Sequence, residues 1–142
     1  MSELIGYAGE RRVSLRISSG KVNVKCYSEQ LTAQVIQIMD KGCEIHLVVT
    51  SSSEAEIHEN KFAKAISSHR NGHVYVLPTG RNDAELSHFA VAGDRAFRFE
   101  TNHDTAEAYL SFNRPDIARS LVSLHQDYVE ICEEHIDLKI SA

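Results

Sequence analysis

Proline is scarce in this chain: the 142 residues include only two, and repeats and low-complexity segments are absent. Long linkers and disordered regions are commonly rich in proline, so the composition argues against both. The length is sufficient for one domain with its own hydrophobic core and too short for two ordinary ones. We therefore expect residues 1–142 to form a single domain.

Cysteine is equally scarce. Cys26, Cys43 and Cys132 are odd in number and have no paired spacing, which argues against a disulfide framework and is typical of free thiols in a reducing compartment. Residues 1–9 have no basic segment followed by an apolar run, so no signal peptide is expected. No apolar stretch has the length of a membrane span. These absences predict a cytoplasmic protein that does not act at a membrane.

An excess of positive charge is also missing, since the formal net charge is −5. The chain as a whole is therefore not expected to attract nucleic acid. Its local concentration of basic residues comprises Arg11, Arg12 and Arg16, in a segment that we interpret as a strand (residues 10–18). These arginines could contact a phosphate backbone, which leaves a small nucleic-acid-associated regulatory protein as an alternative function. Charged residues that protect an exposed edge strand are the commoner explanation.

Common catalytic and metal-binding motifs are absent as well. There is no P-loop with its glycines and lysine, no Gly-x-Ser-x-Gly of a serine hydrolase and no His-Glu-x-x-His. Among the eight histidines, His69 and His73 are four residues apart, but Gly72 lies between them, where a helix is expected to have ended. No cysteine lies near either histidine to complete a zinc site. We predict neither a bound metal ion nor a cofactor.

Most of the chain shows clear strand or helix patterns. Polar and apolar residues alternate where strands are expected, and apolar residues recur every three or four positions where helices are expected. Gly42 follows the first expected helix, where a left-handed residue commonly ends one, and Ser53 with Glu56 forms a capping box that predicts the start of the second. The elements expected before residue 78 are strands over 10–18 and 21–27, a helix over 28–41, a strand over 43–49, a helix from 53 to about 70 and a strand over 73–77.

Residues 86–100 contain two short β-forming runs on either side of Gly93 and Asp94. Both residue types tolerate the backbone angles of a tight turn, so we expect a β-hairpin. Residues 101–111 have a mixed pattern that suggests a helical turn near 106–110. Pro115 then predicts the first turn of a long helix, and residues 136–140 alternate like a final strand.

Strands that alternate with helices favour an α/β fold: a mixed, largely parallel sheet with helices on both faces. Sites in such folds lie at the carboxyl ends of the parallel strands, which here include residues 50–53 and 78–84. Ser51 and Ser52 lie at this edge before a helix, where backbone N–H groups can hold a phosphate. Serines in that position also serve simply as caps and turns, which is the simpler interpretation.

The other candidate ligand site lies around the expected hairpin. Arg81 in the preceding loop and Arg95 and Arg98 in the hairpin are expected near His88, and together they could form a small anion pocket suited to phosphate. Alternatively, Arg98 and Glu100 point to the same side of one strand and pair with neighbours on the sheet surface.

The order of elements and the hairpin sequence His88-Phe-Ala-Val-Ala-Gly-Asp-Arg95 resemble one half of a phospholipase D superfamily protein. In that family, alternating strands and helices lead to a hairpin that carries His-x-Lys-x4-Asp, and a long helix follows. Members often read Lys-Phe-Ala-Ile-x-Asp-Gly-Arg along this hairpin. The resemblance covers residues from about Lys21 to Glu134 and implies a phospholipase D-like domain.

The family's catalytic set is not preserved in either register of the motif. If its histidine falls on Leu86, its lysine falls on His88 and its aspartate on Gly93. If the motif begins at His88 instead, Ala90 takes the lysine position and Arg95 takes the aspartate position. The resemblance therefore implies a degenerate member that keeps the fold.

The chemistry of the family indicates how the loss of the His/Lys/Asp set would affect function. The histidine attacks phosphorus to form a covalent intermediate, and the lysine stabilises charge on the phosphoryl oxygens. Without that set, the resemblance implies a non-catalytic module that binds a protein or a phosphate-bearing ligand. Active members with a single half pair two copies, so a homodimer is expected, alone or within a larger assembly. The alternative is a divergent, metal-independent phosphodiesterase or nuclease that uses His88 with nearby arginines.

Overall fold

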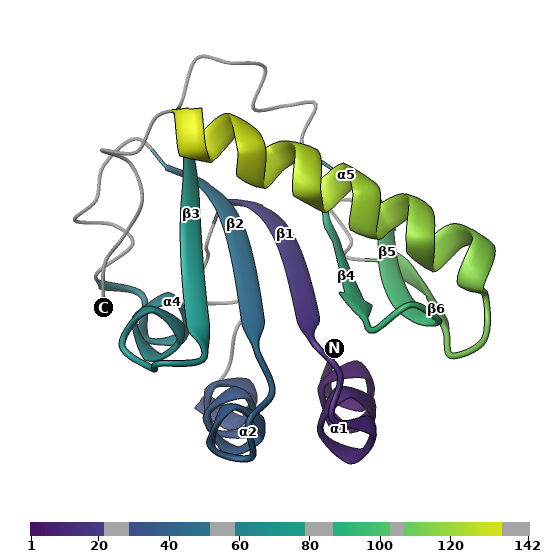
Figure 1. The fold of residues 1–142 in the computed structure, drawn as a ribbon, viewed down its shortest axis with the longest axis horizontal. Coiled ribbons are helices and arrows are strands. Elements are labelled where there is room, and N and C mark those ends of the chain that lie inside the picture. The colour runs from purple at the N-terminus through teal and green to yellow at the C-terminus, as the bar shows by residue number, and fades with distance from the viewer. Residues whose placement is uncertain (22–28, 52–58, 79–86, 103–106, 135–142) are drawn as a thin grey trace.

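The computed structural model describes residues 1–21, 29–51, 59–78, 87–102 and 107–134. Within these ranges the chain forms one six-stranded sheet and four helices around it (Figure 1). The elements in chain order are α1 (Ser2–Arg11), β1 (Leu15–Lys21), α2 (Glu29–Asp40), β2 (Ile45–Ser51), α4 (Lys61–Ser67), β3 (Gly72–Pro78), β4 (Phe89–Ala92), β5 (Ala96–Asn102), β6 (Glu107–Ser111) and α5 (Pro115–Glu134). None of these helices is long and apolar enough to span a membrane.

The sheet has a parallel part and an antiparallel part. Its strand order is β3-β2-β1-β4-β5-β6, in which β1, β2 and β3 are parallel and β4, β5 and β6 pair antiparallel. The crossovers through α2 and α4 return the chain to the end of the sheet at which the preceding strand began, as parallel pairing requires. The hairpin β4–β5 adds to the free side of β1, so β1 lies inside the sheet with a neighbour on each side.

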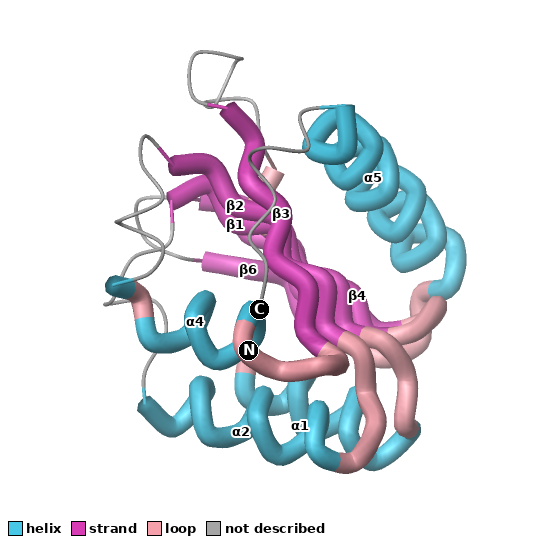
Figure 2. The backbone as a smooth tube through the Cα atoms, turned by 60° about the vertical axis from the view of Figure 1, so that its left-hand side comes forward, coloured by secondary structure: helices cyan, strands magenta, loops and turns pink. Residues whose placement is uncertain are grey.

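Helices cover both faces of the sheet (Figure 2). One face packs against α1, α2 and α4, and its core includes Leu15, Ile17 and Leu47 from the strands. The other face packs against α5, which contributes Ala118, Leu121 and Cys132 to two smaller clusters. Successive strand residues point to opposite faces, so each strand contributes to both cores. The prediction of an α/β fold with a mixed sheet and helices on both faces is confirmed.

Several local predictions are confirmed. α2 lies within the expected helix over 28–41, and Gly42 follows it with a φ of 99°. β2 and β3 match the apolar runs at 43–49 and 73–77 to within two residues. The hairpin turns at Gly93, whose φ is 62°, and Pro115 is the first residue of α5. A left-handed backbone at both glycines explains why these residues stand at these two chain reversals.

Two local predictions are wrong. Residues 10–18 do not form one strand, because Glu10 and Arg11 end helix α1, Arg12 is its left-handed cap, and β1 begins only at Leu15. The short alternation around residues 10–14 suggested a strand. However, the apolar residues before it, Leu4, Ile5 and Ala8, have helical spacing and form the buried side of α1.

The second error is the helical turn near 106–110, because residues 107–111 form strand β6 along β5. Pairing with a neighbouring strand there outweighs a weak local pattern. Other predictions lie outside the described residues, namely the strand over 21–27 beyond Lys21, the capping box of Ser53 and Glu56, the loop over 78–84 beyond Pro78, and the strand over 136–140. Within the described part, α4 begins after Asn60, whose side chain accepts a hydrogen bond from the Ala63 N–H.

Candidate functional site

His88 lies immediately before β4, beside the carboxyl end of β1. The Ser18 hydroxyl donates a 2.6 Å hydrogen bond to the Ser87 carbonyl, and the Ser87 N–H donates to the Tyr128 hydroxyl of α5 at 3.3 Å. The His88 carbonyl accepts a hydrogen bond from the Glu100 N–H at 3.0 Å. His88 is half-buried and held between three elements, at the edge of the sheet where the parallel strands end.

The residue two positions after His88 is Ala90, which is completely buried in the core under α1, α2 and α4. Its partner across the hairpin is Arg98, and His88 precedes Phe89, whose partner is Phe99. Alternation along β4 and β5 therefore places His88, Ala90 and Arg98 on the same face of the sheet. Burial and then the charge of Arg98 lower the pKa of the Met1 amino group at the start of α1. Arg98 thus extends along the face that α1 covers.

The other predicted phosphate-binding residues do not all gather around His88. Arg95 lies in the hairpin turn, at the opposite end of β4 from His88, where its side chain contacts Asn113 at 3.4 Å and Asp94 at 4.0 Å. Ser51 is the last residue of β2. Arg81 and Ser52 lie outside the described residues. Of the predicted set, the structure brings Arg98 close to His88 and separates Arg95 from it.

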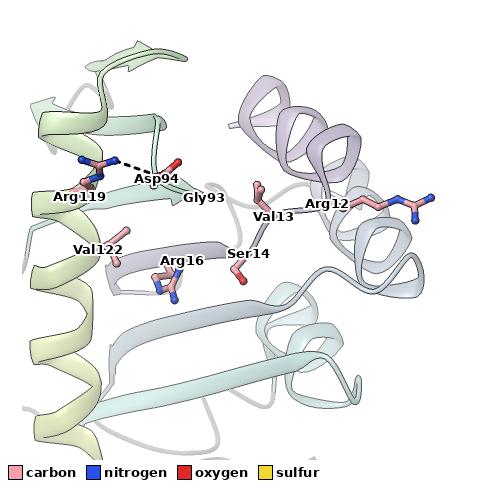
Figure 3. A pocket seen from close by; sticks show the side chains of 8 residues that line it. All are labelled: Arg12, Val13, Ser14, Arg16, Gly93, Asp94, Arg119 and Val122. Atoms are coloured by element: carbon pink, nitrogen blue, oxygen red, sulfur yellow. Dashed lines mark ion pairs between the residues drawn. The ribbon is translucent and has the colours of Figure 1, made fainter.

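A pocket of about 520 Å³ lies at the other end of β1, between the sheet, the hairpin turn and α5 (Figure 3). It is lined by Arg12, Val13, Ser14, Arg16, Gly93, Asp94, Arg119 and Val122. The Arg119 guanidinium lies 3.7 Å from the Asp94 carboxylate, while Arg16 extends from β1 toward α5. Arg16 and Arg119 outweigh the single carboxylate of Asp94, so the charged side chains at this open pocket have a net positive charge, which suits an anion.

The basic residues Arg11, Arg12 and Arg16 do not form one surface, although the sequence suggested a common strand. Arg11 lies on α1, with its guanidinium 5.2 Å from the centre of the Tyr7 ring. Arg12 caps α1, and its side chain extends away from the pocket in Figure 3. Arg16 lies on β1, opposite His46 of β2. The pocket therefore depends on Arg16 and on Arg119, which sequence reasoning missed because α5 is distant in the chain.

Two histidines with lowered pKa values lie near Arg16: His125 on α5, which is buried, and His46 on β2, which is half-buried. His125 is 1% exposed, and its Nε2–H lies 3.1 Å from both the Ile17 and the His46 carbonyl oxygens, to which it donates. Burial is the main reason that the pKa of His125 is lowered to about 4, with Arg16 and His46 adding repulsion. Burial and then the neighbouring His73 likewise lower the pKa of His46 to about 4. Both rings are therefore neutral near neutral pH.

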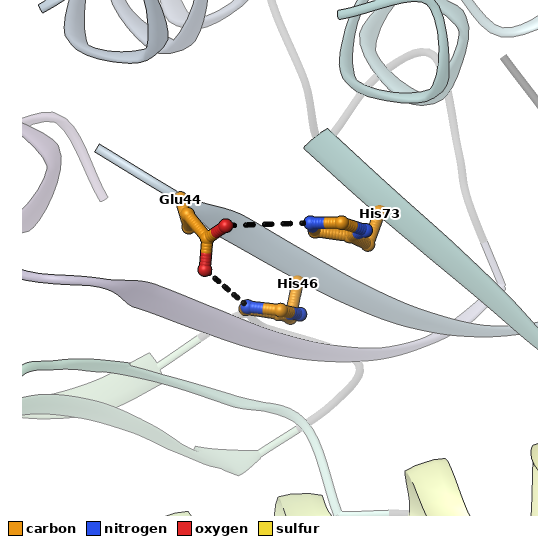
Figure 4. A group of neighbouring side chains, drawn as sticks. All are labelled: Glu44, His46 and His73. Carbon is orange, nitrogen blue, oxygen red and sulfur yellow. Dashed lines mark ion pairs between the residues drawn. The ribbon is translucent and has the colours of Figure 1, made fainter. Parts of the chain in front are cut away.

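Glu44, His46 and His73 form a cluster on the same face of the sheet, at the amino ends of β2 and β3 (Figure 4). His46 and His73 are directly paired across the two parallel strands, and their rings stack with centroids 4.6 Å apart. The Glu44 carboxylate lies 3.6 Å from Nε2 of His46 and 3.8 Å from Nε2 of His73. These three side chains have the donor atoms that could hold a metal ion. Glu44, which immediately precedes β2, and His46 are two residues apart, a spacing that could have drawn attention to them in the sequence.

No family model and no curated protein match the sequence. Solved structures do match it. Nuc, a phospholipase D family member from Salmonella typhimurium, aligns with a TM-score of 0.63 and 12% identity over 91% of this chain and 86% of its own. TrmBL2, an archaeal chromatin protein with a novel mode of DNA binding, aligns with a TM-score of 0.64 and 10% identity over 91% of this chain.

Polyphosphate kinase from Porphyromonas gingivalis aligns with a TM-score of 0.53 and 14% identity over 90% of this chain. The matched region is 47% of the TrmBL2 chain and 21% of the kinase chain, so this chain corresponds to a part of each. At such low identities the likeness concerns the fold alone. Together with the sheet order and the long helix after the hairpin, it shows that this chain has a phospholipase D-like fold.

Proposed function

We propose that this chain is a non-catalytic, homodimeric phospholipase D-like domain that binds a phosphate-bearing ligand in the pocket of Arg16 and Arg119. The observation that carries the non-catalytic part is Ala90. If the motif begins at His88, this alanine stands where the family's lysine would be, and it is fully buried in the core cluster under α1, α2 and α4. Arg98 lies on the same face, but on the neighbouring strand β5, opposite Ala90.

The arginine pocket supplies the binding part of the proposal. Arg16 approaches from β1 and Arg119 from α5, so the two guanidinium groups lie on different sides of one open cavity. Guanidinium groups form charge-assisted, bidentate hydrogen bonds to phosphate oxygens. The Ser14 side chain adds a hydroxyl to the lining. Asp94 already contacts Arg119 and would compete with an anion for that guanidinium.

Calorimetric titration with pyrophosphate tests this pocket. We expect Arg16→Gln and Arg119→Gln each to weaken binding at least about tenfold, because a hydrogen bond to a charged group contributes roughly 1.5–3 kcal/mol. Asp94→Asn should instead strengthen binding, since it removes a competing negative charge. Arg70→Gln is the matched control, because it makes the same charge change on an exposed arginine outside the pocket. Equal losses in Arg70→Gln and Arg16→Gln, or no binding by the unmodified chain, would contradict the pocket.

Hydrolysis of an activated phosphodiester in the presence of a chelator separates this proposal from the enzyme alternative. We expect no turnover above that of the buffer. Turnover that disappears in His88→Ala, while the variant remains folded, would establish the divergent phosphodiesterase instead. A short DNA duplex, titrated at several salt concentrations, distinguishes nucleic acid from a small ligand: a steep loss of affinity with salt would favour the nucleic-acid alternative.

Strand β6 is the surface that we propose for the homodimer. It is an edge of the described sheet, and it exposes Tyr109 (71%), Leu110 (40%) and, just after it, Phe112 (41%). An exposed edge with large apolar side chains is prone to pair with another strand. A second copy that pairs along β6 would cover these side chains and continue the sheet across the interface.

Light scattering after gel filtration measures the proposed dimer. We expect the unmodified chain to have twice its monomer mass of 15.9 kDa, and Tyr109→Lys combined with Leu110→Lys to shift it to monomer. Lysine on an edge strand opposes further pairing because of its charge. Ile36→Lys is the matched control, since Ile36 is also an exposed large apolar residue (38%) but lies on α2. A monomeric unmodified chain, or a dimer that persists in the double variant, would refute this interface.

A further inference from the structure

We propose that Glu44, His46 and His73 bind a divalent transition-metal ion, with Zn²⁺ as the reference ion. The inference is independent of the proposed phosphate pocket, because it uses different side chains and a different ligand. Two imidazoles and one carboxylate are a known ligand set for zinc, with the remaining positions taken by water.

The distances within this cluster suit a single ion. Two ligands of a tetrahedral zinc ion lie about 3.4 Å apart, given metal–ligand distances of roughly 2.0–2.2 Å. The Glu44 carboxylate oxygens lie 3.6 Å from His46 Nε2 and 3.8 Å from His73 Nε2, and the donor atoms of the three residues all lie within 4.8 Å of one another. The two Glu44 contacts are within a few tenths of an ångström of this spacing, and the two histidine nitrogens would approach each other to complete the coordination. In Figure 4 both rings direct a nitrogen at the carboxylate.

The sheet positions the two histidines before any ion binds. His46 and His73 are register partners on β2 and β3, so their separation is set by the spacing of neighbouring strands. Their rings stack within 9° of parallel, and His46 also stacks beside Tyr75 with centroids 6.3 Å apart. Because the rings are nearly parallel, they must tilt toward each other to direct both lone pairs at one ion. His73 and Glu44 are exposed enough to make that adjustment, and they leave the ion accessible to water.

The charges around the cluster are nearly balanced. Glu44 supplies one negative charge, and Arg16, which lies opposite His46 on β1, supplies one positive charge on the same face. A bound divalent ion would therefore be only partly neutralised, and it would favour an anion as its further ligand. The simpler alternative is that Glu44 only contacts the two histidine rings, with no ion involved.

Metal titration of the untagged chain, stripped with a chelator, distinguishes these possibilities. We expect one Zn²⁺ per chain by calorimetry, and Co²⁺ should give the visible d–d absorption of a low-coordinate site without a thiolate charge-transfer band. His73→Gln and Glu44→Gln should each weaken binding at least tenfold, since even mutation of residues that only support a ligand costs about 10–100-fold. Both residues are partly exposed, so these variants should fold, which thermal unfolding without metal checks directly.

His69→Gln is the matched control. Nε2 of His69 also contacts a carboxylate, that of Asp40, at 2.8 Å, but this pair is not part of the three-ligand cluster. We expect the affinity of this variant for Zn²⁺ to be unchanged. Unchanged affinity in His73→Gln, an equal loss in His69→Gln, or a Co²⁺–thiolate band would overturn the proposed site. If the unmodified chain binds no Zn²⁺ at all, the cluster is an ion pair only.

Discussion

Replacing Gly72 with alanine is expected to destabilise the chain by about 3 kcal/mol. Gly72 is the first residue of β3, where a Cβ atom would overlap the backbone carbonyl oxygen of Ile66 and lie 2.7 Å from its carbonyl carbon. Backbone atoms cannot rotate out of the way as a side chain can, so α4 and β3 must move apart. Overpacking in a closely packed core typically costs about 1–3 kcal/mol, and sometimes more. The free energy of unfolding in urea measures this loss.

Gly6→Ala is the control for this prediction. Gly6 lies on the exposed side of α1, and a Cβ there would meet no atom within 4 Å. Alanine restricts the unfolded chain and favours the helix, so this variant should gain about 0.5–1 kcal/mol. The two substitutions are chemically identical and should change stability in opposite directions. A Gly72→Ala variant within 1 kcal/mol of the unmodified chain would show that α4 does not pack on β3 as closely as the structure describes.

The chain should lose stability as the pH falls from about 6.5 to 4, and His125 should account for much of the loss. The pKa of His125 is about 4 in the folded chain, against 6.5 for an ordinary histidine. Between these two pH values the unfolded chain binds more protons, so acid favours unfolding. This contribution is fully present above pH 6.5 and is lost progressively down to pH 4. The pKa difference corresponds to a loss on the order of 3 kcal/mol.

His125→Gln tests the origin of this acid sensitivity. Glutamine can keep an N–H donor toward the Ile17 and His46 carbonyls but does not titrate. Unfolding free energies measured from pH 7.5 to 4 should therefore fall less steeply in this variant than in the unmodified chain. Part of the slope should remain, because His46 also has a lowered pKa. His69→Gln is the control for losing a histidine elsewhere. Parallel curves for His125→Gln and the unmodified chain would count against a neutral, buried His125.

Much of the fold could be predicted because its signals are local. The apolar spacing of α2 and Gly42 after it depend on a few neighbouring residues, and so does the turn at Gly93. Helix α1 was missed because its apolar positions, Leu4, Ile5 and Ala8, precede a stretch with a misleading alternation. Strand β6 was missed because its exposed residues have no alternating pattern and become a strand only by pairing with β5.

The candidate sites likewise combine local features that could be predicted from the sequence with longer-range contacts that could not. The positions of His88 and Ala90 relative to each other follow from the sequence, since two residues along a strand share a face. The sequence also predicted an anion site made of arginines, and it grouped Arg95 and Arg98 with His88. In the structure, the strand reversal places Arg95 at the far end of the hairpin. The sequence pattern indicates which residues belong to the hairpin, but it does not show which of their side chains meet in the folded chain.

By itself, the sequence determined the type of most elements, the α/β class and the resemblance to phospholipase D proteins, because backbone preferences and apolar spacing act over a few residues. Only the tertiary structure decided which distant side chains meet. Parallel pairing brings His46 beside His73, and the packing of α5 on the sheet brings Arg119 to Arg16 and seals His125 from water. Such contacts depend on strand order and register, which are set by the burial of both faces of the sheet at once.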